Sequence, residues 1–129
     1  RLVGSEMCIR DRHTIFHTEM VVNLGSSMVF DYACYDKPCS FVNYDTARTA
    51  NTNSSVKKIY NYVHFRSMPA PEAVVWLHSP EAIADQIRTT LQNPKSNISH
   101  AKEWFAVINQ QPFQDASVRI WKAIRNIIH

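Results

Sequence analysis

The clearest pattern of apolar and polar positions in this chain lies between residues 20 and 45. In order, it contains an apolar run at 20–24, a glycine and two serines at 25–27, apolar residues near helical spacing at 28–35, a Lys-Pro step at 37–38 and a second apolar run at 39–42. Short apolar runs bounded by turn residues are typical of buried strands, serine favours the N-cap of a helix, and proline ends one. The pattern therefore predicts a strand, a tight turn, a helix beginning at Ser26 or Ser27, and a second strand.

After residue 45 the pattern predicts a polar loop over 46–55, a short helix over 57–62, a short strand over 62–65 and another strand over 73–77. Three helices are expected next, over 80–92, 99–109 and 115–128. The stripe of Ile83, Ile87 and Leu91 should pack the first of them on the sheet. The aromatic stripes of the later helices are expected to form core or interdomain surface. Together these elements predict an α/β fold with parallel strands followed by C-terminal helices.

Residues 1–12 follow neither a helical nor a strand period. The segment resembles the peptide obtained when sequencing-adaptor DNA is translated at the end of an assembled environmental sequence. Such a segment is excluded from fold reasoning. We therefore expect residues 1–12 to be non-native, and the natural protein to continue upstream of His13. A genuine disordered N-terminus is the alternative.

Composition narrows the class of protein. The chain has 129 residues, of which 45% are hydrophobic and 19% charged, as in an ordinary globular domain. Its formal charge of +3 is spread along the chain, which gives little support to a nucleic-acid surface but is compatible with a phosphate-bearing small ligand. No apolar run is long enough for a membrane span. Three cysteines without zinc-like spacing favour a reducing, cytoplasmic compartment, with the cysteines acting as small buried hydrophobes, and no metal site is expected.

The candidate chemistry gathers where the predicted strands end. In open α/β sheets, ligands bind beyond the carboxyl ends of the strands. Gly25 is the only glycine after His13, so it is expected where positive φ or close backbone approach is required. Ser26 and Ser27 would place hydroxyls at a helix N-terminus, where N–H groups favour a phosphate. Asp31, one turn along, suits either the hydroxyls of a ribose or polyol, or the charge of the helix end. Asp45, after the second strand, is a further candidate for ligand contact.

The serines, the acid and the Lys-Pro step form a spaced motif. From Ser26 to Pro38 the chain reads Ser-Ser-Met-Val-Phe-Asp-Tyr-Ala-Cys-Tyr-Asp-Lys-Pro. This resembles the Ser-Ser-x-x-x-Asp-x-Ala-x-x-x-Lys-Pro core of CDP-glycerol glycerophosphotransferases, within the two-domain nucleotide-sugar transferases of the GT-B fold. Nucleotide-sugar 2-epimerases share a looser version. Gly25 differs from the aromatic residue that often precedes the serines, and Asp36 differs from the glycine of the epimerases.

The resemblance implies that residues 13–129 are the C-terminal part of a Rossmann-like, doubly wound GT-B domain that binds the nucleotide donor. Ser26 and Ser27 would hold the donor diphosphate, and Asp31 would bind ribose or donor hydroxyls. The implied reaction transfers a sugar from a nucleotide-diphosphate donor to a hydroxyl acceptor on a glycan or polyol, as in cell-surface polysaccharide biosynthesis, with no cofactor. CDP-glycerol-type glycerophosphate transfer is the alternative. The catalytic base would lie in a missing N-terminal acceptor domain, so this piece alone should be inactive, and peripheral membrane association of the full-length protein stays open.

Two other functions remain as alternatives. A serine hydrolase could use Ser26 or Ser27 with His64 and Asp31 or Asp45, although Met28 and Val29 stand where the nucleophile elbow has its second glycine. The other alternative is a non-catalytic interaction module that retains the fold.

Overall fold

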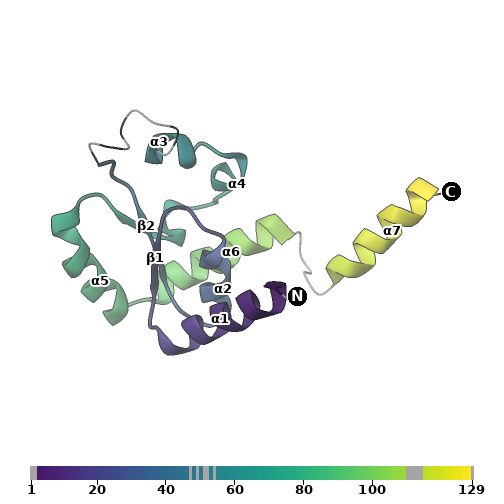
Figure 1. The fold of residues 1–129 in the computed structure, drawn as a ribbon, viewed down its shortest axis with the longest axis horizontal. Helices are drawn as coiled ribbons and strands as arrows, with labels where there is room; N and C mark the ends of the chain where they lie inside the picture. The colour runs from purple at the N-terminus through teal and green to yellow at the C-terminus, as the bar shows by residue number, and fades with distance from the viewer. Residues whose placement is uncertain are drawn as a thin grey trace.

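The computed structural model describes residues 3–46, 48, 50, 53, 55–109 and 115–128, with side chains from Ile9 onward. Figure 1 shows a small parallel sheet with helices around it and one helix set apart at the C-terminal end. The helices and strands are α1 (Val3–His17), β1 (Val21–Asn23), α2 (Met28–Cys34), β2 (Cys39–Val42), α3 (Val56–Ile59), α4 (Val63–Arg66), β3 (Val75–Leu77), α5 (Ile83–Gln92), α6 (Lys95–Asn109) and α7 (Ala116–Ile128), with short 3₁₀ turns η1 (Pro71–Ala73) and η2 (Pro80–Ala82).

The sheet has the order β1-β2-β3, and both strand pairs are parallel. Val21 lies opposite Cys39, and Phe41 lies opposite Trp76. All three strands therefore end at the same edge, and the turns after β1, β2 and β3 meet there. The predicted α/β fold, with parallel strands followed by C-terminal helices, is confirmed.

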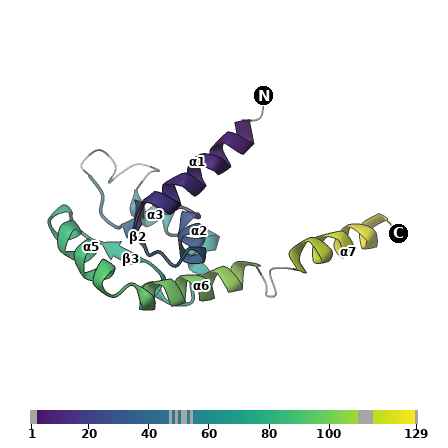
Figure 2. The same ribbon diagram turned by 90° about the horizontal axis from the view of Figure 1, so that it is seen from below.

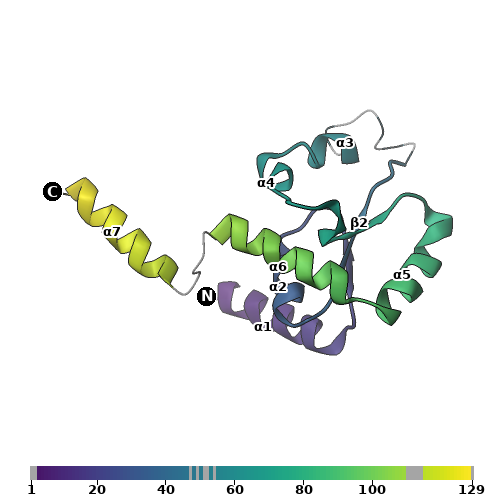
Figure 3. The same ribbon diagram turned by 180° about the vertical axis from the view of Figure 1, so that it is seen from behind.

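The core lies on the face of the sheet that carries Phe41. Helices α2 and α6 pack side by side there, and Figure 3 shows α6 lying across the sheet next to α2. Trp104 of α6 is 1% exposed and contacts Phe30 of α2 edge to face, with ring centroids 4.8 Å apart. The remaining buried members of this cluster come from α2, β2, α4, α6 and the segment from η1 to the residue before β3: Val29, Ala33, Cys39, Phe65, Ala73, Val74 and Ala101.

Several predicted elements need correction. Residues 62–65 were expected to be a strand, but Val63–Arg66 forms helix α4. Both sides of β2 are already paired, one with β1 and the other with β3, and the helix places the side chain of Phe65 in the core. Residues 3–12 belong to helix α1, although their sequence has no helical period. Helix α6 begins at Lys95, ahead of the predicted Ser99.

The apolar stripe of α5 is also rotated from the prediction. Leu91 is 41% exposed, whereas Thr90 is buried, and the Thr90 hydroxyl donates a hydrogen bond to the Gln86 carbonyl at 2.7 Å. That bond lets a threonine take a buried position without an unsatisfied hydroxyl.

Of the predicted loop, residues 46, 48, 50, 53 and 55 are described and lie in no helix or strand; the others lie outside the described residues. Within the described part of the chain, no helix is long and apolar enough to cross a membrane.

Candidate functional site

The turn after β1 is built by side chains as well as by glycine. Asn23, the last residue of β1, accepts a hydrogen bond from the Ser26 N–H at 3.2 Å through its Oδ1. The Ser26 hydroxyl in turn accepts the N–H of Met28 at 3.2 Å. Ser26 is therefore the serine whose side chain caps the start of α2. Asn23 is a positioning residue that the sequence pattern did not single out. An asparagine three residues before the serine is the signal that an Asx-type turn would give.

Ser27 occupies the backbone N-cap position of α2, but its side chain makes no capping hydrogen bond. Its side chain is exposed, and among the described residues neither its N–H nor its hydroxyl has a hydrogen-bond partner. Ser27 is thus the residue of the turn with donors available to a ligand.

Gly25 is required at its position for two separate reasons. Its φ is +64°, in the left-handed region that favours glycine. A Cβ at this residue would lie 2.7 Å from Cζ of Phe65 and 3.1 Å from Cγ2 of Ile59. The prediction of positive φ or close approach at Gly25 is confirmed on both counts. The connection between β2 and β3, which carries Ile59 and Phe65, therefore covers one side of the serine turn.

The end of β2 is tied to its neighbours. The Asn43 N–H donates to the Leu77 carbonyl at 2.8 Å, and the Asn43 amide nitrogen lies 3.2 Å from Nδ1 of His78. The carboxylate of Asp45 accepts the Ser55 hydroxyl at 2.8 Å and the Val56 N–H at 3.0 Å. Asp45 thus closes the loop before α3 and caps that helix, so both of its carboxylate oxygens are already engaged by the protein.

Asp31 lies on the flank of α2 that faces α1. It lines a depression of about 350 Å³ with Asp11, Arg12, Ile15 and Tyr35. Partial burial raises the pKa of the Asp31 carboxyl, and the nearby Asp11 carboxylate raises it further. Ser27 does not line this depression. Asp31 therefore lies on the helix that Ser27 begins, but it faces α1. Its neighbour Asp11 belongs to the segment expected to be non-native.

The residues Asp36, Lys37 and Pro38 lie at the edge of the sheet opposite the serine turn. Lys37 precedes β2, and its ammonium group donates to the carbonyls of Ile15, Phe16 and Thr18 at 2.6, 3.1 and 2.6 Å. These are carbonyls at the C-terminal end of α1, where a cation is favoured. Lys37 therefore holds α1 against the sheet and lies away from the serine turn.

Replacing Lys37 by methionine is expected to lower the free energy of unfolding by about 1–3 kcal/mol, because three carbonyls lose a charged donor. Urea denaturation of the purified chain measures the change. Lys102→Met is the matched control, since it removes only an exposed ion pair with Asp36, and it should cost less than about 1 kcal/mol. Equal losses for the two variants would contradict the role assigned to Lys37.

Cys39 behaves as the predicted small buried hydrophobe. It is 2% exposed, and burial raises the pKa of its thiol to about 12. Cys34 departs from that prediction because its side chain is exposed, and Cys8 lies outside the described side chains. No group of histidine, cysteine and acidic residues suited to a metal ion occurs among the described residues.

The geometry gives no support to a serine hydrolase. His64 is exposed on α4, where its ring lies against Phe65 with centroids 4.0 Å apart. A nucleophile and its base must come within hydrogen-bond reach. Within the described ranges no hydrogen bond joins the His64 ring to Ser26 or Ser27.

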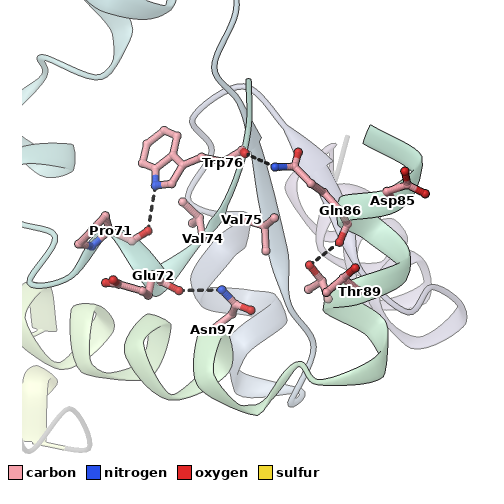
Figure 4. Close-up of a pocket in the computed structure, with 10 residues that line it drawn as sticks. Pro71, Glu72, Val74, Val75, Trp76, Asp85, Gln86, Thr89 and Asn97 are labelled. Carbon is pink, nitrogen blue, oxygen red and sulfur yellow. Dashed lines mark hydrogen bonds between the residues drawn. The ribbon is translucent and has the colours of Figure 1, made fainter. Parts of the chain in front are cut away.

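A separate cavity lies beside β3. It has a volume of about 510 Å³ and lies between β3, η1, α5 and the start of α6 (Figure 4). The Gln86 amide donates to the Trp76 carbonyl at 3.2 Å, and the Asn97 amide donates to the Glu72 carbonyl at 2.9 Å, so side chains satisfy backbone groups around it. Its lining includes the carboxylates of Glu72 and Asp85 and no lysine or arginine, so it does not suit a diphosphate.

Comparison of the chain with protein-family models, with curated proteins and with solved structures found no match.

Proposed function

We propose that this chain carries the donor-diphosphate site of a GT-B-type nucleotide-sugar transferase, with CDP-glycerol-type glycerophosphate transfer as the alternative. The observation that carries the proposal is the Gly25-Ser26-Ser27 turn, which joins the carboxyl end of a parallel strand to a helix and leaves the donors of Ser27 available. Turns at this place in α/β sheets are where ligands bind. The motif from Ser26 to Pro38 adds the resemblance that specifies a nucleotide donor.

In this proposal Ser27 donates its hydroxyl and N–H to a phosphate oxygen. Gly25 lets the backbone make the turn that presents them, and Asn23 and Ser26 fix its shape through their hydrogen bonds. Charge-assisted hydrogen bonds of this kind stabilise negative charge on a departing phosphate. Asp31 would accept the hydroxyls of the ribose or polyol. Asp45 contributes indirectly, by holding the β2–β3 connection that covers the turn.

Isothermal titration calorimetry of the chain with CDP and UDP tests the proposal. We expect saturable binding that Ser27→Ala weakens roughly 10- to 100-fold, since a hydrogen bond to a charged group contributes about 1.5–3 kcal/mol. Asp31→Ala should weaken binding of a nucleotide that carries ribose but leave binding of inorganic pyrophosphate unchanged. Ser99→Ala, an exposed serine on α6, is the control and should have no effect.

Two results would contradict the proposal in different ways. Unchanged affinity in both Ser27→Ala and Asp31→Ala would mean that the nucleotide binds elsewhere on the chain. Absence of saturable binding of either nucleotide would count against the donor-binding function itself.

A further inference from the structure

Helix α7 carries one broad apolar side that the rest of the described chain does not cover. At about 100° per residue, five of its six large apolar residues fall on one side of the helix, and Val118, which is 51% exposed, falls on the other side. Their exposed fractions are high: Ile120 60%, Trp121 61%, Ile124 37%, Ile127 84% and Ile128 72%. No described residue of α7 is buried, and Figures 1 and 2 both show the helix standing apart from the sheet.

The other side of α7 is basic. Arg119, Lys122 and Arg125 lie there, and residues 116–128 contain no aspartate or glutamate. Lys122 and Arg125 are exposed, while Arg119 donates to the Asn109 carbonyl at 2.8 Å. The helix thus combines an apolar side that includes a tryptophan with a polar side of uniform positive charge.

We propose that α7 binds the surface of an anionic lipid bilayer. A helix of this composition lies in the plane of the interface, with its apolar side at the acyl boundary and its cations among the headgroups. Trp121, near the border of the two sides, suits the interfacial depth that tryptophan prefers. Charge complementarity selects this occupant, because anionic headgroups would neutralise the cations of α7, whereas a second copy of α7 has no carboxylate side chain to pair with them. The proposal is independent of the nucleotide site.

Flotation of the whole chain with vesicles tests the proposal. One set of vesicles is phosphatidylcholine alone, and the other contains about 30% phosphatidylglycerol, the anionic lipid. We expect the chain to float with the anionic vesicles and not with the neutral ones. Tryptophan fluorescence should shift to shorter wavelength on binding, and Trp121→Phe should abolish most of that shift while the chain still floats.

Substitutions on the two sides separate their contributions. The double variant Ile124→Ser, Ile127→Ser should lose vesicle binding, because it removes apolar area from the centre of the apolar side. The double variant Lys122→Gln, Arg125→Gln should bind the anionic vesicles roughly tenfold or more weakly. Asn126→Ser is the control. All these side chains are exposed, so the thermal unfolding of every variant should match that of the parent chain.

Three results would overturn the proposal. The chain could fail to float with either kind of vesicle, or it could float equally with both. It could also form an oligomer in size-exclusion chromatography with light scattering that the Ile124→Ser, Ile127→Ser variant disperses, in which case the apolar side of α7 is an interface between copies of the chain.

Discussion

Replacing Trp104 by alanine is expected to lower the free energy of unfolding by about 3–5 kcal/mol, a loss typical of deleting a fully buried large aromatic side chain. Trp104 is 1% exposed, its ring contacts Phe30, and its indole N–H donates to the Ser67 hydroxyl at 3.0 Å. The substitution would leave a void between α2, α4 and α6. Urea denaturation followed by circular dichroism measures the loss.

Trp121→Ala is the matched control for this prediction. Trp121 is 61% exposed on α7, so its removal should change the unfolding free energy by no more than about 0.5 kcal/mol. Trp104→Phe keeps most of the ring volume and should fall between the parent chain and the alanine variant. If the two Trp→Ala variants lost the same stability, α6 would not form the core described above.

Gly25→Ala should have the second large effect, lowering the free energy of unfolding by about 2–5 kcal/mol. A left-handed φ costs a non-glycine residue about 1–2 kcal/mol, and forcing a methyl group into a packed site costs about 1–3 kcal/mol. Both terms apply here, because φ is +64° and the new Cβ would lie 2.7 Å from the buried ring of Phe65. The same denaturation measurement applies.

A double-mutant cycle with Phe65→Leu isolates the contribution of the Phe65 ring. In the Phe65→Leu background the aromatic ring edge is gone, so Gly25→Ala should cost less than in the parent chain. The cost of the left-handed φ, about 1–2 kcal/mol, and the 3.1 Å approach to Ile59 remain. An equal cost of Gly25→Ala in both backgrounds would show that Phe65 does not press on the turn.

The elements around the serine turn were predictable because their signals are local. The apolar run before Gly25, the serines that cap a helix and the proline that ends it all act within a few residues of one another. The predicted second strand, Cys39–Val42, has the bounds that the structure gives it. Parallel pairing followed from the short helical crossover between the strands.

Other features depend on partners far along the chain, and no local signal indicates them. Lys37 finds its three acceptors at the end of α1, some twenty residues earlier, so the sequence presents it only as a motif residue. From its position after a strand, Asp45 was predicted to contact a ligand. In the structure its carboxylate instead accepts hydrogen bonds from Ser55 and Val56. Residues 62–65 alternate like a strand, and only the completed sheet order shows that no strand position was left beside β2.

The choice between the two serines needed geometry of another kind. Spacing placed either Ser26 or Ser27 at the start of α2. In the structure the Ser26 N–H donates to Asn23 and the Ser26 hydroxyl accepts the Met28 N–H, so Ser26 is engaged by the turn and Ser27 is the serine that can meet a ligand. That assignment emerges only once the turn is built.

The contact of Gly25 with Ile59 and Phe65 also bears on the order in which the protein folds. The strand and helix on either side of the turn are close in sequence and can form early. Ile59 and Phe65 can cover the turn only after the chain has closed a long loop through β2, which carries an entropic cost. We therefore expect the serine turn to be completed late, together with the β2–β3 connection. A ligand that binds the completed turn and not the unfolded chain would shift the folding equilibrium toward the state in which the loop is closed. Its binding would therefore protect α3 and α4, as well as α2, from local unfolding.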